Sequence, residues 1–272
     1  MIITRETKLC ISLASKPSNF GVTIHNFLYE AMGLDFIYKA CSTSNLEGAI
    51  NGVRALNIRG CSISMPYKET VIDLLDEVEE VAHSIGAVNT VVNESGTLKG
   101  YNTDVTGAIE ALKLLNIDKK ESVLVLGAGG AAKAILYALK INGSDQVAVA
   151  NRDSSRLKNL QGITDFEPVN WDQRNNFPAD VIINATSIGM NPKAKDMPVE
   201  KDIISNCRAV MDVIVSPIES SLISFADSME KQVAHGYIMS MEQARAQFKL
   251  YTGVEVPNSL IREKIVALLK DL

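Results

Sequence analysis

A glycine-rich loop between a short apolar run and a helical pattern places the strongest constraint on how this chain folds. Residues 122–126, Ser-Val-Leu-Val-Leu, have the nearly continuous apolar character of a strand buried within a parallel sheet. Gly-Ala-Gly-Gly-Ala-Ala follows at residues 127–132, and residues 133–141 are patterned as a helix. This order of strand, G-x-G-x-x-A loop and helix predicts a dinucleotide site, although the loop alone would also suit a tight structural turn.

Each small residue of the loop meets a separate physical need. Gly127 permits the tight turn after the strand, Gly129 lets the backbone approach a pyrophosphate, and Ala132 allows the helix to pack closely on the strand. The N-terminus of the helix offers unpaired N–H groups to the phosphates. We therefore expect the dinucleotide to be bound by Gly127, Ala128, Gly129, Gly130 and Ala131.

The end of the next predicted strand, residues 146–150, indicates which dinucleotide is bound. An acidic residue at this point usually holds the ribose 2′-hydroxyl of NAD, but here Asn151 follows the strand. Arg152 and Arg156 stand one helical turn apart, and two guanidinium groups suit the 2′-phosphate of NADP. Asp153 lies between the two arginines, where it either weakens their positive field or caps the following helix. If no phosphate is bound there, the two arginines would simply form a solvated helix face. We predict NADP as the cofactor, with NAD as the alternative.

Composition and charge narrow the classes of partner. The chain has 272 residues, of which 46% are hydrophobic and 22% charged, and this suits a folded protein of one large or two small domains. A net charge of -5 offers no basic excess to nucleic acid or to an anionic membrane, so the expected partner is a small molecule. No run reaches the roughly 20 apolar residues of a membrane span, and the N-terminus lacks a signal-peptide core, which predicts a cytoplasmic location. Four cysteines without metal-ligand spacing predict buried thiols and no metal site.

Short apolar runs alternate with longer helical patterns, which predicts an α/β protein with largely parallel sheets. The predicted strands are residues 8–13, 36–40, 61–64, 87–92, 98–101, 122–126, 146–150, 180–183 and 232–235. The predicted helices are residues 23–32, 46–56, 67–75, 103–115, 133–141, 239–251 and 257–269. A more regular α/β unit begins after residues 101–104, so we expect a domain boundary there.

Several polar signatures occur around the glycine loop. They are Ile24-His25-Asn26, Ser64-Met65-Pro66-Tyr67-Lys68, Gly86-Ala87-Val88-Asn89-Thr90, Asn102-Thr103-Asp104, Asn151-Arg152, Asn-Ala-Thr-Ser-Ile-Gly-Met at residues 184–190, and residues 236–244 with Gln243. In these motifs and in their order the chain resembles the shikimate dehydrogenase family along nearly its whole length. The motif at residues 184–190 is unusually specific.

The resemblance implies an α/β protein of two domains. An N-terminal α/β substrate domain would comprise residues 1–102 and be completed by residues 237–272. A Rossmann-type doubly wound NADP-binding domain would comprise residues 103–236, inserted between them. The pattern of the chain agrees, because the last predicted helices follow the last predicted strand and could return to the first domain.

The chemistry of a dehydrogenase assigns roles to the polar signatures. Oxidation of a secondary alcohol needs a hydride acceptor and a group that takes the hydroxyl proton. The resemblance implies that Lys68 is this acid/base and that Asp104 holds the lysine and the substrate oxygen. Taken alone, Lys68 would be a surface lysine and Asp104 a favourable charge at a helix N-terminus.

Other site residues also follow from the resemblance. Ser64, Asn89 and Gln243 would hydrogen-bond the substrate, although each could instead stabilise a turn. Cofactor contacts are implied for Thr186, Ser187 and Gly236.

Two departures from the family pattern fall where a substrate carboxylate should bind. The family usually has Ser-x-Ser-Pro before the histidine motif, whereas this chain has Asn19-Phe20-Gly21-Val22. We expect Asn19 to contribute to substrate binding, and Ser15 and Ser18 are near enough to compensate for the lost hydroxyls. The family's Asp-x-x-Tyr-x-Pro has Val215 in place of tyrosine.

The resemblance implies an NADP-dependent oxidoreductase that interconverts shikimate and 3-dehydroshikimate, or a related hydroxylated ring acid, with a link to aromatic amino acid biosynthesis. The two departures indicate a divergent member of the family. The alternatives are a dehydrogenase of quinate or another polyol acid, and a non-catalytic sensor of nucleotide and ring acid. An intact Lys68 and Asp104 argue against the sensor, because binding alone needs no proton-transfer pair. We expect a monomer or a homodimer.

Overall fold

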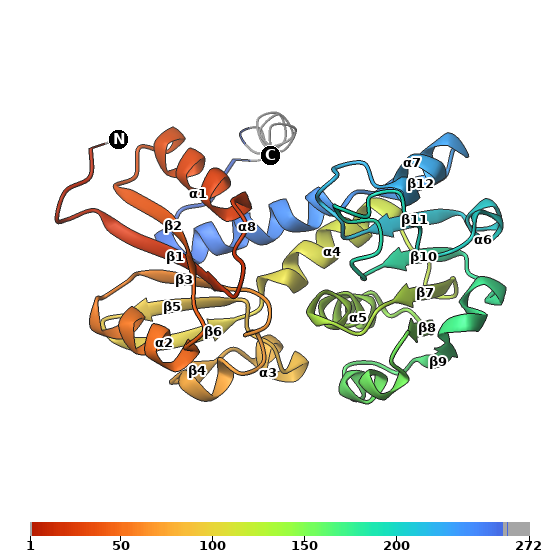
Figure 1. Ribbon diagram of the computed structural model, residues 1–272, viewed down its shortest axis with the longest axis horizontal. Coiled ribbons are helices and arrows are strands. Elements are labelled where there is room, and N and C mark those ends of the chain that lie inside the picture. The colour runs from red at the N-terminus through yellow and green to blue at the C-terminus, as the bar shows by residue number, and fades with distance from the viewer. Residues whose placement is uncertain (1, 258–259, 261–272) are drawn as a thin grey trace. The chain divides into compact units, whose positions relative to one another are not determined.

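The computed structural model describes residues 2–257 and residue 260, and these form two compact units, each with a six-stranded sheet (Figure 1). The first unit contains the chain up to Thr103 and the chain from Gln243 onward, and the second contains residues from Asp104 to Glu242. The predicted helix at residues 257–269 lies almost wholly outside the described residues.

The first unit has a mixed sheet in the order β2-β1-β3-β5-β6-β4. Strands β1, β2 and β3 are parallel, and β5 runs antiparallel to β3 and β6. Its elements are β1 (Lys8–Ala14), α1 (Phe20–Ala31), β2 (Phe36–Ser42), α2 (Leu46–Ala55), β3 (Gly60–Ile63), η1 (Ile72–Leu74), β4 (Glu77–Val78), α3 (Glu80–Ile85), β5 (Thr90–Glu94) and β6 (Thr97–Tyr101).

Alternation along β1 and β3 gives the two faces of this sheet different chemistry. Leu13 pairs with Ile63, and both belong to a buried apolar cluster that includes Ile50 of α2. Ser12 pairs with Ser62 one position earlier, so both hydroxyls project from the opposite face. One face therefore contributes to the core, while the other presents hydroxyl groups near the carboxyl ends of parallel strands.

The predicted helix at residues 67–75 is wrong, because this segment consists of turns and the short 3-10 helix η1. The β-branched residues Thr70, Val71 and Ile72 follow one another here, and their restricted χ1 angles disfavour an α-helix. The strand predicted at residues 87–92 begins only at Thr90. Sequence reasoning did not predict β4 and α3.

The second unit has a fully parallel sheet in the order β12-β11-β10-β7-β8-β9. The chain moves outward from β7 in one direction and then from β10 in the other, which is the doubly wound Rossmann order, so the predicted fold class is confirmed. The elements are α4 (Thr103–Leu115), β7 (Ser122–Leu126), α5 (Gly130–Asn142), β8 (Gln146–Asn151), η2 (Ser154–Leu160), β9 (Glu167–Asn170), η3 (Trp171–Asn176), β10 (Val181–Asn184), α6 (Lys201–Asn206), β11 (Ala209–Asp212), α7 (Ser221–Ser228), β12 (Gln232–Ala234) and α8 (Gly236–Thr252).

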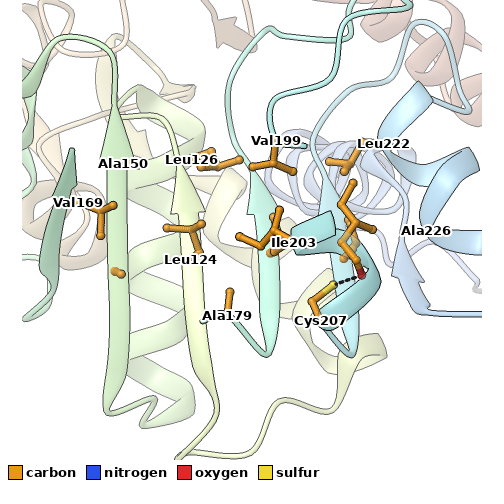
Figure 2. Packing of buried hydrophobic residues seen from close by; sticks show 14 of the residues in the cluster. Leu124, Leu126, Ala150, Val169, Ala179, Val199, Ile203, Cys207, Leu222 and Ala226 are labelled. Carbon is orange, nitrogen blue, oxygen red and sulfur yellow. Dashed lines mark hydrogen bonds between the residues drawn. The ribbon is translucent and has the colours of Figure 1, made fainter. Parts of the chain in front are cut away.

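Helices on both faces explain why the central strands of this sheet are almost entirely apolar. Leu124 and Leu126 of β7 project from one face and pack with Ile203 of α6 and Leu222 of α7 (Figure 2). Cys207 lies in the same cluster, where its thiol donates to a main-chain carbonyl. Cys10, Cys61 and Cys207 are buried as expected, whereas Cys41 is only half-buried.

Helix α8 carries the chain from the second unit into the first, which it joins from Gln243 onward. Its C-terminal part packs closely on the first sheet, since a Cβ at Gly60 of β3 would overlap the Tyr251 ring. Arg59 Nε also donates to the Tyr251 carbonyl oxygen at 2.8 Å.

Of the helices within the described residues, none combines the length and apolar character that a membrane crossing requires.

Candidate active site

A cavity of about 140 Å³ opens in the first unit between the hydroxyl-bearing face of the sheet, α1 and α8. This is several times the roughly 30 Å³ that one water molecule occupies in the liquid. The lining consists of Ser12, Ala14, Pro17, Ser18, Phe20, Gly21, His25, Tyr38, Ser62, Ser64, Gln243, Ala244 and Gln247.

The polar part of this lining is uncharged. Apart from His25, its polar side chains are hydroxyls and amides, with no lysine, arginine or carboxylate among the described lining residues. Burial lowers the pKa of His25 to about 4, against the opposing effect of a hydrogen bond with Gln247, so the ring is neutral at pH 7. A ligand in this cavity would therefore be recognised by neutral donors and acceptors.

Two of the four predicted substrate residues, Ser64 and Gln243, line the cavity, whereas Asn19 and Asn89 do not. Asn19 is the N-cap of α1 and its side chain is exposed, without a capping hydrogen bond. Its neighbour Ser18 lines the cavity instead. Of the two serines expected to compensate for the missing hydroxyls, Ser18 is thus in place, whereas the exposed Ser15 is outside the lining.

Backbone hydrogen bonds bring three of the polar signatures together in the first unit. Val88 N–H donates to the carbonyl oxygen of Lys68 at 2.8 Å, and Ile63 N–H donates to that of Asn89 at 2.8 Å. Asn89 N–H in turn donates at 3.0 Å to the carbonyl oxygen of Tyr101, the residue that precedes Asn102-Thr103-Asp104. Lys68 itself is half-buried, in the turn that follows the cis Met65–Pro66 bond.

The Asn89 amide is buried and its orientation is fixed. Oδ1 accepts from Thr103 N–H at 2.8 Å, from Thr103 Oγ1 at 3.1 Å and from Thr90 Oγ1 at 2.8 Å. Nδ2 has no acceptor among the described residues. Because a main-chain N–H can only donate, the end bonded to Thr103 N–H must be the oxygen. The two N–H groups of the buried Asn89 amide thus have no partner among the described residues.

Gln247 is a site residue that sequence reasoning missed. Nε2 donates to Thr90 Oγ1 at 2.9 Å and to Ser62 Oγ at 3.3 Å, while Oε1 lies 3.4 Å from His25 Nε2. These bonds join α8 and α1 to the strands that hold Asn89. A signal existed in the sequence, because Gln247 comes four residues after Gln243 and so shares its helix face.

Asp104 lies in the first turn of α4 and is 6% exposed. A carboxylate there is favoured by the positive end of the helix dipole. It begins the second unit, whereas Lys68 belongs to the first.

The glycine loop of the second unit meets the steric needs of a pyrophosphate. Gly127 has φ +113°, a conformation that L side chains rarely adopt, and its N–H donates to the Ala150 carbonyl oxygen at 2.8 Å. A Cβ there would lie 2.9 Å from the Ala185 carbonyl oxygen. At Gly129, the N-cap of α5, no described atom beyond the adjoining chain lies within 4 Å of a Cβ position. Gly127 is therefore needed for the turn, while the backbone at Gly129 is open to a ligand at a helix N-terminus.

The end of β8 presents two exposed arginines. Asp153 caps η2, since its carboxylate accepts from Ser155 N–H at 3.1 Å and from Ser155 Oγ at 2.6 Å. These bonds, with a smaller effect of Arg156, lower the pKa of Asp153. Asn151 Nδ2 donates to the Asp153 carbonyl oxygen at 2.7 Å, and Arg152 and Arg156 are exposed. The capping alternative for Asp153 is the one observed.

A hydrogen-bonded turn follows β10 at residues 184–188. Asn184 Oδ1 accepts from Thr186 N–H at 3.1 Å and from Thr186 Oγ1 at 2.7 Å. Asn184 Nδ2 donates to Asp212 Oδ1 at 3.0 Å and to the Ile188 carbonyl oxygen at 3.1 Å. Thr186 is half-buried and Ser187 is exposed. Asp212 thereby holds the turn that contains both predicted cofactor residues.

Gly236 has a packing role in the second unit. It begins α8, and a Cβ there would overlap the main chain of Val213 and Ile214. The absence of a side chain at this position lets α8 start against the segment after β11. That segment also contains Val215, which is half-buried.

We predict a pH-dependent stability from Asp212, which is 1% exposed. Burial raises its pKa from 3.8 to about 6, although Ser220, main-chain N–H groups and Asn184 donate to the carboxylate. Because the folded value exceeds the unfolded one, the stabilising contribution is complete below about pH 4 and is lost as the pH rises through 6. Relative to Asp212→Asn, the wild type should lose on the order of 3 kcal/mol of unfolding free energy between pH 4 and 7.

Urea unfolding at pH 4, 5, 6 and 7 measures this difference. Asp227→Asn, a change at an exposed acid on α7, is the control and should show no comparable trend. A gap between wild type and Asp212→Asn that stays constant with pH would contradict the assignment.

Comparisons with known proteins find the same family for both units. The model of the shikimate dehydrogenase substrate binding domain matches residues 19–91, and the shikimate/quinate 5-dehydrogenase model matches residues 110–215. A shikimate dehydrogenase-like protein of Haemophilus influenzae is 40% identical over 96% of this chain and 97% of its own length.

Two solved structures are also similar to this chain. Quinate dehydrogenase from Corynebacterium glutamicum, in complex with NAD, has a TM-score of 0.89 and 30% identity, covering 96% of this chain and 99% of that one. Shikimate 5-dehydrogenase from Thermus thermophilus, in complex with NADP(H) and shikimate, has a TM-score of 0.85 and 30% identity, with the same coverage.

Proposed function

Because the chain belongs to the shikimate dehydrogenase family of oxidoreductases, we propose that it is an NADP-dependent enzyme that interconverts shikimate and 3-dehydroshikimate or a closely related hydroxylated ring acid. The observation that carries this proposal is that a chain of this family retains both Lys68 and Asp104. The doubly wound second unit and the neutral, hydroxyl-lined cavity of the first support it.

The first unit would bind the substrate. Ser64 and Gln243 line the cavity and would hydrogen-bond the ring acid. Asn89 would donate through Nδ2, the end that its neighbours leave unused. Lys68 would take the proton of the reacting hydroxyl, with Asp104 holding the lysine and the substrate oxygen. As the carbonyl forms, the C–H electron pair leaves with its hydrogen as hydride, and the O–H proton passes to Lys68. Charge and atoms therefore balance.

The second unit would hold the dinucleotide, whose nicotinamide accepts or supplies the hydride. Residues 127–131 would receive the pyrophosphate at the start of α5, where Gly129 is open. Thr186 and Ser187 would lie toward the nicotinamide. Gly236 would contact the cofactor where α8 packs against the main chain after β11. Asn151, Arg152 and Arg156 would bind the adenosine end.

We predict that Arg152→Ala and Arg156→Ala weaken NADP binding more than NAD binding. Each removes a charge-assisted bond to the 2′-phosphate, which is worth about 1.5–3 kcal/mol, so the KM for NADP should rise roughly ten- to hundredfold. Steady-state rates with both cofactors measure the ratio. Lys158→Ala, at an exposed lysine on η2, is the control. Equal losses with NAD and NADP would show that the arginines do not read the phosphate.

The proposal is tested by NADP reduction with shikimate and with quinate, each repeated with NAD. Saturable turnover of shikimate would support the principal assignment, and efficient turnover of quinate alone would favour the alternative. The similarity to a quinate dehydrogenase is the specific reason to include that substrate. Cofactor and ring-acid binding without any turnover would contradict an enzyme and favour a sensor.

We propose a cytoplasmic protein that acts as a monomer or a homodimer, and sedimentation at several protein concentrations would distinguish the two.

A further inference from the structure

Tyr38 of β2 is a cavity residue that none of the assigned roles uses. It is 3% exposed and its side chain lines the cavity. β2 is an edge strand, where backbone groups on one side lack a neighbouring strand. Asn26 occupies that side: Nδ2 donates to the Tyr38 carbonyl oxygen at 2.9 Å, and Oδ1 accepts from Tyr38 N–H at 2.8 Å. One amide therefore fixes both polar backbone groups of Tyr38.

Two further neighbours fix the ring of Tyr38. His25 stacks on it, with ring centroids 4.5 Å apart and planes inclined by 13°. Gly21 is the second neighbour, since a Cβ added there would lie 3.2 Å from Tyr38 Cε1 and 3.3 Å from the Tyr38 hydroxyl oxygen. The phenol end of the ring thus takes up the space beside Gly21. The His25-Asn26 motif and Gly21 all act on this one side chain.

The Tyr38 hydroxyl is held by the polar face of the sheet. The side chains of Ser62 and Ser12, which pair with each other across β3 and β1, face it closely enough to lower its pKa by hydrogen bonding. Both serines can donate to the phenolic oxygen, and this leaves its own proton for a ligand. Burial raises the pKa of Tyr38, so that proton stays in place at working pH.

We propose that Tyr38 contacts the substrate and selects for its carboxylate, donating through its hydroxyl where a serine at position 21 would otherwise stand. This inference rests on the proposed function, because it takes the ligand to be a ring acid. With no basic side chain among the described lining residues, a carboxylate in the cavity depends on neutral donors. A phenol is more acidic than a serine hydroxyl and is the stronger donor of the two.

Tyr38→Phe tests this role against a matched control. We expect the KM for shikimate to rise roughly tenfold or more, with the KM for NADP unchanged. Tyr251→Phe removes a hydroxyl from another ring of the same unit, 1% exposed and without a hydrogen-bond partner among the described residues, and should leave the KM unchanged. Thermal unfolding of both variants checks that each is folded.

The neutral methyl ester of shikimate identifies the group that Tyr38 reads. In equilibrium binding, the ester should have nearly the same affinity for wild type and Tyr38→Phe, whereas shikimate should bind the variant more weakly. Equal losses for acid and ester would overturn the carboxylate assignment.

A double variant tests whether positions 21 and 38 exchange one hydroxyl. Gly21→Ser should weaken shikimate binding, because its Cβ would crowd the phenol, while Gly21→Ser/Tyr38→Phe should bind better than Tyr38→Phe alone. Losses that simply add would contradict the exchange.

A wild type that neither binds nor oxidises a ring acid would refute the proposed function itself. A wild type that does both, with Tyr38→Phe equal to Tyr251→Phe, would leave that function standing and remove the role of Tyr38.

Discussion

Lys68→Ala is expected to lower kcat for ring-acid oxidation by at least roughly a hundredfold, while the KM for NADP stays within about twofold of wild type. The proton of the reacting hydroxyl would lose its positioned acceptor, and general acid–base catalysis typically contributes about a hundred- to ten-thousandfold. The backbone should be unaffected, since the link from Lys68 to Val88 uses the main-chain carbonyl oxygen. Rates over a range of pH values with saturating NADP measure the effect.

Two companion variants sharpen this result. Lys39→Ala, at an exposed lysine on β2 of the same unit, removes a lysine charge that has no assigned role and should keep kcat. Asp104→Asn should also lose turnover, because a neutral amide cannot stabilise the positive charge that Lys68 gains with the proton. If Lys68→Ala retained wild-type turnover, the acid/base assignment would be wrong even though the family assignment would stand.

The segment from β7 to β8 in the second unit could be predicted well because local signals and the tertiary structure agree there, whereas β9, α6, β11 and α7 were not predicted. An apolar strand, a loop that needs a positive φ at Gly127, and a helix that begins at Gly130 suffice to predict the nucleotide-binding geometry. The elements of the first unit were harder to predict from the sequence. β4 has two residues and α3 has six, too few for a periodic pattern, and the β-branched run at residues 70–72 prevented the expected helix.

The cavity residues were hidden for a different reason. Tyr38 stands in an alternating strand at a position that predicts a core ring, and only the fold brings it beside Gly21. Gln247 is far along the chain from Thr90, which accepts its shortest hydrogen bond. Hydrogen bonds of this kind depend on long-range packing, so no local pattern predicts them. The loss of a serine at position 21 was visible in the sequence, but the side chain that fills its place was not.

Gly127→Ala is expected to destabilise the second unit and to weaken NADP binding at least roughly tenfold. An L side chain at φ +113° costs about 1–3 kcal/mol, and the new Cβ would approach the Ala185 carbonyl oxygen to 2.9 Å. Ala185 precedes Thr186, so a shift of Ala185 away from the new Cβ would also move the turn that contains Thr186 and Ser187, the residues predicted to lie toward the nicotinamide. Urea unfolding and NADPH fluorescence titration measure the two effects.

A second glycine separates stability from binding. Gly129→Ala should leave the unfolding free energy nearly unchanged, since no described atom beyond the adjoining chain lies within 4 Å of its Cβ position, yet it should weaken NADP binding if the pyrophosphate lies against this backbone. Gly52→Ala on α2, with the same open surroundings and no cofactor role, is the control for both measurements. Unchanged NADP affinity in Gly129→Ala together with a loss in Gly127→Ala would mean that the loop shapes the turn at residues 184–188 but does not itself hold the phosphates.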